Sequence, residues 1–303
     1  MKRSTLATWA ALLGYSIFGL SFLFSKLALN LTTPFVLLSA RFLTAFLVLN
    51  LLALTKKMPF HLRGKPIAPL LLLGLVQPVI YFICENYGIA LTSSSFSGVM
   101  LGIIPVTGLV AGRLLLAERC SRFQVACALC SVVGVALTCV GGEMVFSPLG
   151  TVLLLTAAAS SSVFTAMSRG IADRFTPFER TYVMFALGSV VFTGIAAVEN
   201  WRNPAALLVP LSTPEFWVAV IYLAVVSSVG AFLLLNFAMN HISVARSSIF
   251  SNFSTVISVL AGIFIMHDSF TPVQLMGIVI ITASVFGVSY RKEPAAGAAN
   301  PDN

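Results

Sequence analysis

The chain has 303 residues, of which 58% are hydrophobic and only 9% are charged. Soluble domains carry about 25% charged residues, so this composition, with a mean hydropathy of +0.98, excludes a soluble globular fold. The net charge of +8 is explained by the basic loops described below, so no nucleic-acid partner is expected. Strands of a membrane barrel would show ten-residue alternation, which is absent. The sequence therefore predicts an all-α integral membrane protein.

Ten apolar segments follow one another, each long enough to cross about 30 Å of hydrocarbon as a helix. The first is too long for the apolar region of a signal peptide, and no small-x-small cleavage site follows it, so we expect it to be retained. The ten helices are expected near Leu6–Ala28, Pro34–Leu54, Ile67–Ala90, Ser94–Leu114, Phe123–Val140, Leu149–Ser168, Pro177–Val198, Glu215–Ala238, Ser243–Ile265 and Pro272–Tyr290.

The second half of the chain repeats the first. Residues 81–140 align without a gap on residues 231–290, at a constant offset of 150, and the matches include Asn86 on Asn236 and Gln124 on Gln274. The first two helices of each half align at an offset of 143. We therefore expect two five-helix repeats, over residues 1–142 and 143–290. A disordered cytoplasmic tail rich in Ala, Pro and Asn should follow over residues 291–303.

The basic residues fall almost entirely on one side of the predicted membrane. Of 18 Lys and Arg, 15 lie on the side of the N-terminus, leaving Lys26, Arg41 and Arg202. The positive-inside rule then places both termini in the cytoplasm, in a multi-pass protein of a bacterial-type inner membrane. We expect the inner basic residues, Arg180 and Arg246 among them, to form a solvated rim against anionic lipid. An odd number of helices per repeat inverts the second half, as in transporters that alternate access.

Several short motifs resemble one family. The family signature is matched by the run from Tyr87 to Ser95, by Pro105, by Leu116-Ala117-Glu118, by Phe123-Gln124, and near the start by Phe18-Gly19, Lys26, Pro34 and Arg41-Phe42. This pattern resembles the EamA-type drug/metabolite transporter (DMT) superfamily, and the second half is a looser match, with Thr255 and Asp268 at the expected Pro and Glu. The resemblance implies a ten-helix carrier with a central cavity lined mainly by helices 1, 3, 4, 6, 8 and 9. Members of the superfamily often export amino acids or related metabolites.

Three ionisable residues lie at similar depth near the outer side. Glu85 is about 7 to 8 Å inside the third helix, Arg41 about 10 Å inside the second, and Lys26 near the outer end of the first. They form a structural ion pair, a proton- or cation-coupling site at Glu85, or an outer gate. The second half has Leu235 and Met184 at the matching positions, which favours a directional role.

Amides and aromatic rings supply the other candidate ligand contacts. Side-chain amides both donate and accept hydrogen bonds, which suits a zwitterionic or neutral polar ligand, although they also link helices. Aromatic rings favour a partly apolar ligand, although they also fill cores. Pro105 and Gln77-Pro78 are expected to bend their helices. The predicted substrate-binding set is Tyr15, Tyr81, Glu85, Asn86, Phe164, Phe232, Asn236, Asn240 and Asn252.

No motif indicates an enzyme, a cofactor or a metal. Cys127 and Cys130 have metal-ligand spacing but no histidine nearby, and the sequence contains no phosphate-binding loop. The predicted function is a secondary transporter that exports a small organic metabolite, an amino acid or related compound, by alternating access. Expected partners are this substrate and the bilayer, with proton coupling and a homodimer left open. The alternatives are an exporter of drugs or lipophilic cations and a membrane-embedded enzyme or scaffold.

Overall fold

The computed structural model describes residues 3–55, 60–92, 94–140, 146–207, 209–266 and 271–290, and the predicted tail over 291–303 lies outside these ranges. Within them the chain is helical and contains no strand. The elements are α1 (Arg3–Leu29), α2 (Pro34–Leu54), α3 (Ala68–Gly74), η1 (Leu75–Ile80), α4 (Tyr81–Ala90), α5 (Ser94–Leu101), α6 (Ile104–Leu116), α7 (Arg122–Thr138), α8 (Pro148–Gly170), α9 (Pro177–Glu199), η2 (Pro204–Leu207), η3 (Val209–Ser212), α10 (Pro214–Ile221), η4 (Tyr222–Ala231), α11 (Phe232–Met239), α12 (Val244–Ser251), α13 (Phe253–Met266) and α14 (Pro272–Tyr290).

These elements form ten membrane-length spans in the described part of the chain. Nine of the described spans are long and apolar enough to cross a membrane, and the tenth is the shorter apolar helix α7, Arg122–Thr138. Its 17 residues give about 25 Å at 1.5 Å per residue, close to the hydrocarbon thickness. The predicted all-α fold with ten transmembrane helices is confirmed.

The helix bounds repeat at the offsets that the sequence shows. At the offset of 150, α5 starts at Ser94 and α12 at Val244, while α7 starts at Arg122 and α14 at Pro272. At the offset of 143, α2 and α9 both start at a proline. A side-chain cap at the start of α7 also recurs at α14, because Gln124 and Gln274 each accept a hydrogen bond from a backbone N–H three residues earlier. The molecule is built from two repeated five-helix halves.

The interruptions within the spans repeat as well. The third span leaves helical geometry at Gln77, just before Pro78, with φ −147° and ψ 121°, and the equivalent stretch of the eighth span is the π-helical segment η4. The fourth span breaks after Leu101 and the ninth after Ser251, 150 residues later. The Asn252 amide at the second break donates to the Gly102 carbonyl at the first, at 3.1 Å. The two broken helices therefore meet at their equivalent breaks.

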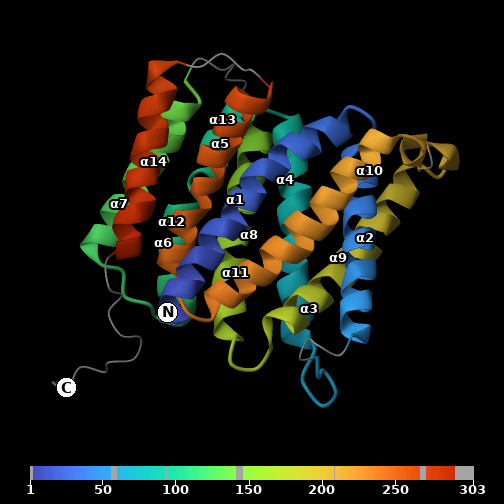
Figure 1. Ribbon diagram of the computed structural model, residues 1–303, viewed down its shortest axis with the longest axis horizontal. Coiled ribbons are helices and arrows are strands. Elements are labelled where there is room, and N and C mark those ends of the chain that lie inside the picture. The colour runs from blue at the N-terminus through green and yellow to red at the C-terminus, as the bar shows by residue number, and fades with distance from the viewer. Residues whose placement is uncertain are drawn as a thin grey trace.

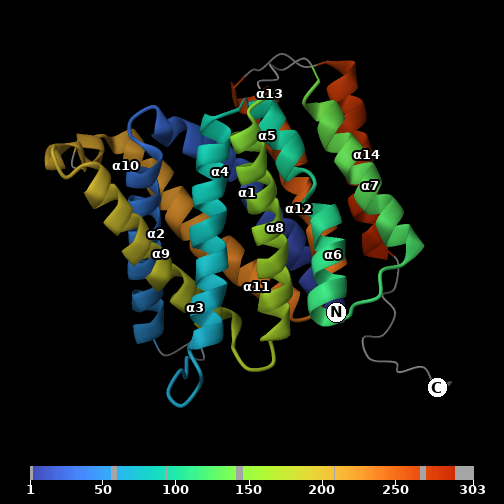
Figure 2. The same cartoon turned by 180° about the vertical axis from the view of Figure 1, so that it is seen from behind.

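Helices of the two halves lie side by side throughout the bundle. The pairs α2 with α9, α7 with α14, α6 with α12 and α1 with α13 are in contact. Figures 1 and 2 show α7 and α14 together at one edge, and α2, α9 and α10 at the other. In Figure 1, α1 rises from the N-terminus at the bottom, whereas α8 descends to the loop that leads into α9. We call the edge of the bundle at the start of α1 the lower end, and the edge at residues 30–33 the upper end.

Candidate functional site

Arg41 is a charged residue in the interior of the bundle. It lies on α2, about 10 Å below the upper end. Its side chain is 6% exposed. Its Nε donates to the Ser228 hydroxyl at 2.7 Å and its Nη2 to the Ser227 hydroxyl at 3.2 Å. Both serines belong to η4, in the other half of the chain. The guanidinium also lies over the Phe82 ring, 5.2 Å from its centroid. Arg41 thus joins the two halves through neutral partners.

Glu85 lies beside Arg41, on α4. It is 8% exposed, and one carboxylate oxygen accepts a hydrogen bond from the Tyr81 hydroxyl, one turn earlier, at 2.8 Å. Glu85 and Arg41 interact electrostatically, but among the described residues they are not within the 4.0 Å that defines an ion pair. The structure therefore brings the two predicted charges into one region without pairing them directly. The side chain of Lys26, the third member of the predicted cluster, lies outside the described residues.

Aromatic side chains surround these charges. Tyr15 on α1 is buried, and its hydroxyl is 3.2 Å from that of Ser247 on α12. Phe232 packs edge-to-face against Phe18 and Phe164, with ring centroids 5.4 and 6.1 Å apart. The predicted residues Tyr15, Tyr81, Phe164 and Phe232 therefore come from four spans into the interior. We call Arg41, Tyr81, Glu85, Ser227 and Ser228 the upper charge site.

A second buried arginine lies close to the lower end. The expectation of a solvated rim is wrong for Arg246 of α12, which is 5% exposed. It is also wrong for Arg180, in the first turn of α9, which is 0% exposed. Its Nη1 donates to the backbone oxygen of Ser168 at 2.5 Å, and its Nη2 donates to the backbone oxygen of Asn236 at 2.7 Å and to the Asn240 side chain. Both carbonyls belong to the last turns of their helices, α8 and α11, where carbonyls lack helical partners. Arg180 therefore caps two helices at once.

An ion pair extends this lower network. Arg169 lies 2.6 Å from Glu118, and the other carboxylate oxygen of Glu118 accepts the backbone N–H of Val244, at the start of α12, at 3.0 Å. Arg169 also donates to the Ile242 and Met239 carbonyls. Together with the Arg180 contacts, these bonds connect α6, α8, α9, α11 and α12. We call Glu118, Ser168, Arg169, Arg180, Asn236 and Asn240 the lower network.

The four predicted amides do not form one site. Asn86 donates to the Phe82 carbonyl of its own helix at 2.7 Å, near the upper end. Asn236 is fully buried near the lower end, where it accepts from Ser168 at 2.6 Å and donates to Thr181 at 3.0 Å. Asn240 joins Arg180, and Asn252 joins the two helix breaks. In the described structure, each amide is thus engaged with protein groups.

Sequence reasoning missed Arg180 as an interior residue and missed the serine pair. Arg180 is only three residues into its helix, where a side chain at a membrane surface normally reaches water. A signal was present, because Asn236 and Asn240 form an i, i+4 polar stripe in an apolar helix and need polar partners. Ser227 and Ser228 were the visible signal for Arg41, as two adjacent hydroxyls in an otherwise apolar segment.

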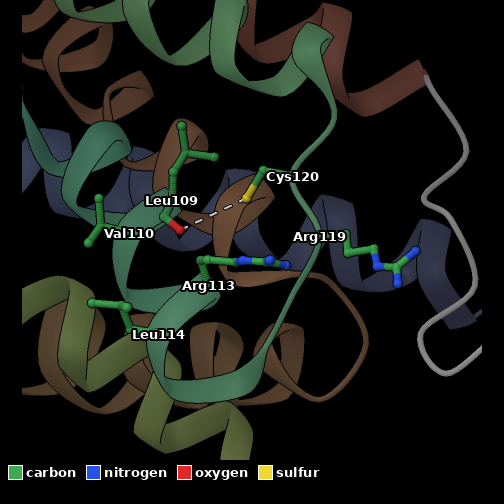
Figure 3. Close-up of a pocket in the computed structure, with 6 residues that line it drawn as sticks. All are labelled: Leu109, Val110, Arg113, Leu114, Arg119 and Cys120. Carbon is green, nitrogen blue, oxygen red and sulfur yellow. Dashed lines mark hydrogen bonds between the residues drawn. The ribbon is translucent and has the colours of Figure 1, made fainter. Parts of the chain in front are cut away.

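The structure also has a hollow on the outside of α6, with a volume of about 700 Å³. It is lined by Leu109, Val110, Arg113, Leu114, Arg119 and Cys120 (Figure 3). The Cys120 sulfur lies 3.9 Å from the Leu109 carbonyl, and Arg119 points away from both. This hollow shares no residue with the upper charge site, so it is not where buried charge gathers.

Ten spans in two repeated halves, with ionisable residues buried between them, define a multi-pass membrane protein of transporter type. The model of the EamA-like transporter family matches residues 5–140 and 148–290. The chain therefore belongs to the EamA-like transporter family, as the resemblance in the sequence predicted.

Two curated relatives and one solved structure illustrate the similarity. "Uncharacterized transporter YcxC" of Bacillus subtilis (strain 168) is 33% identical over 296 residues, covering 96% of this chain and 95% of the relative. "Uncharacterized transporter YetK" of the same organism is 24% identical over 288 residues, covering 93% and 86%. A crystal structure with 19% identity superposes with a TM-score of 0.77 and covers 94% of both chains, which supports the fold.

Proposed function

We propose that the protein is a secondary transporter that exports a small organic metabolite, an amino acid or related compound, across the cytoplasmic membrane. The observation that carries this proposal is the upper charge site, where Arg41 and Glu85 are buried in the membrane interior without forming a direct ion pair. Charges in this position are costly and typically mark a substrate or ion pathway. Membership of a transporter family supports the same reading.

Alternating access is the mechanism that this architecture favours. The lower network ties five helices together, so the lower end is closed. Packing along α1 is looser toward the upper end, because residues between Ala7 and Tyr15 are largely buried, whereas those between Ser16 and Ser25 are mostly half-buried. The two repeats, residues 1–142 and 143–290, rock about the contact between their helix breaks. Both termini are cytoplasmic, because the basic loops lie at the lower end.

The energy needed for this motion is modest. Differential contacts of about 1 to 3 kcal/mol between the two states are enough to shift the balance. The free energy lost when the ion pair between Glu118 and Arg169 breaks is of this size. The free energy gained from a ligand contact at the upper charge site is similar. Glu85 is also the proposed proton-coupling group, and with Lys26 and Arg41 it forms the outer gate.

A second candidate substrate class is lipophilic cations. The observation in its favour is that Glu85 bonds the Tyr81 hydroxyl and that the Tyr81 ring packs against Phe82. A carboxylate beside aromatic rings binds cations through its charge and through the ring faces. In that case Glu85 is the counter-ion of the ligand. Arg41 argues against this class, because it places a like charge beside the bound cation.

Reconstitution tests the proposal directly. The purified full chain in proteoliposomes is expected to catalyse counterflow of at least one radiolabelled compound from a panel of amino acids and of cationic dyes. Uptake of an amino acid supports the first class, and uptake of dyes alone supports the second. The absence of protein-dependent flux for every compound contradicts both.

A further inference from the structure

Arg41 and Glu85, the two charged residues of the upper charge site, each have one polar atom without a hydrogen-bond partner among the described residues. Arg41 uses Nε and Nη2 to bond Ser228 and Ser227, so Nη1 has no hydrogen-bond partner among the described residues. Glu85 accepts the Tyr81 hydroxyl with one oxygen, and its second oxygen has no such partner there either. A buried charge with neutral partners alone is costly. A ligand that supplies an opposite charge to each of these groups would remove this cost.

The free groups lie beside the same stretch of α4. Arg41 covers the ring of Phe82, and Glu85 lies three residues further along the same helix. Tyr81, one residue before Phe82, donates its hydroxyl to Glu85 at 2.8 Å. Arg41 and Glu85 therefore both lie beside the first turns of α4, and neither belongs to an ion pair with another described residue.

We propose that Arg41 and Glu85 bind the two ends of one small zwitterion, a proposal that rests on the transport function above. Arg41, held by Ser227 and Ser228, receives the carboxylate, because a guanidinium presents parallel N–H donors that match two carboxylate oxygens. Glu85, oriented by Tyr81, receives the ammonium group. The ligand's middle packs against the Phe82 and Tyr81 rings.

Charge balance gives this assignment its specificity. Arg41 and Glu85 contribute one positive and one negative group when both are ionised, so their charges sum to zero. A zwitterion leaves that sum at zero and gives each protein charge an opposite partner. A ligand with only a carboxylate or only an ammonium group leaves one buried charge in excess, which is strongly unfavourable in a low-dielectric interior.

The test compares three probes that differ in which end group is charged: L-leucine, L-leucine methyl ester and N-acetyl-L-leucine, with matching sets built on L-phenylalanine and L-threonine. Each unlabelled probe competes with counterflow of the free amino acid in proteoliposomes containing the full chain. We expect at least one free amino acid to compete about tenfold better than its ester and its N-acetyl form, the scale of one lost hydrogen bond to a charged group.

The variants separate recognition from stability. Arg41→Gln should abolish discrimination against the ester and keep discrimination against the N-acetyl form, whereas Glu85→Gln should do the reverse. The double change Ser227→Ala and Ser228→Ala should weaken ester discrimination in part, and it tests the proposal if Arg41→Gln fails to fold. Arg202→Gln, at an exposed position, is the matched control and should leave both ratios unchanged.

The outcomes are distinguishable. Crossed loss of discrimination supports the proposal. If both charge variants weaken competition by all three probes equally, the ligand assignment is overturned and the transport function stands. The same conclusion follows if the unaltered chain prefers the ester or the N-acetyl form to the free amino acid. The absence of any flux overturns the transport function and the ligand assignment together.

Discussion

Two of the buried arginines in the described part of this bundle, Arg41 and Arg180, differ in what surrounds them. Arg180 bonds the terminal carbonyls of two helices and two polar side chains, and the negative ends of helix dipoles stabilise its charge in place. Arg41 bonds two serine hydroxyls and has a carboxylate nearby that it does not touch. Burial is nearly equal, so burial alone does not identify a functional charge. The kind of partner distinguishes the two, and it separates a structural lower network from the upper charge site that we propose binds the ligand.

The largest effect is expected from removing the lower arginine. Arg180→Leu leaves the Ser168 and Asn236 carbonyls and the Asn240 side chain without their donor, so the free energy of unfolding should fall by about 3 kcal/mol. Thermal unfolding in detergent measures the change. Arg174→Leu, at an exposed position two residues before Thr176, is the control, with an expected change within about 0.5 kcal/mol. If Arg180→Leu and Arg174→Leu lowered the melting temperature by the same amount, the structural role of Arg180 would be refuted.

The next largest loss of stability is expected from a substitution at the contact between the two halves of the chain, where α6 packs against α12. A Cβ at Gly108 on α6 would lie 2.0 Å from the Ser248 hydroxyl and 2.3 Å from its Cβ, so Gly108→Ala must push α6 and α12 apart. We expect a loss of about 1 to 3 kcal/mol in the same melting experiment. Gly194→Ala is the matched control, because nothing lies within 4 Å of its added Cβ. A loss of similar size in both variants would show that the close approach of the halves is unimportant.

The ion pair of the lower network should contribute less. Arg169 and Glu118 are both partly exposed, so solvent screens their attraction, and Arg169→Gln should cost about 1 kcal/mol or less. The expected signature is a small melting shift with altered transport kinetics. If Arg169→Gln lowered the free energy of unfolding as much as Arg180→Leu, the ion pair would be the main contact that holds the lower end closed.

The smallest effect on stability is expected at the upper site. Glu85→Gln keeps the shape of the side chain and an acceptor for the Tyr81 hydroxyl, so the free energy of unfolding should change by under about 1 kcal/mol. Flux should nevertheless fall at least tenfold, because the charge is lost. Normal flux in this variant, at every pH tested, would remove Glu85 from the transport mechanism and from proton coupling.

The sequence predicted the fold better than the site. Ten apolar segments and the polar matches at a fixed offset were enough for the helices and the repeat, because membrane helices are limited by hydrocarbon thickness and backbone hydrogen bonding. The depths of Arg41 and Glu85 also followed from helix geometry.

The partners of each polar residue could not be read in the same way. Asn86 and Asn236 match in the repeat, yet Asn86 lies near the upper end and Asn236 near the lower end, each with different partners. The burial of Arg180 depends on α8 and α11 ending beside it, a long-range contact that local patterns do not encode. The pairing of Asn252 with Gly102 likewise depends on how two distant breaks meet.

Thiol accessibility at the two ends tests the central claim most directly, that one end closes as the other opens. In a background without the five native cysteines, Ala166→Cys reports on the lower end, where Ala166 is fully buried, and Ser25→Cys reports on the half-buried upper end. A charged thiol reagent should label Ser25→Cys faster. Adding Arg169→Gln should speed labelling at position 166 and slow it at position 25. Labelling that rises at both positions, or an unchanged position 166, would contradict the account.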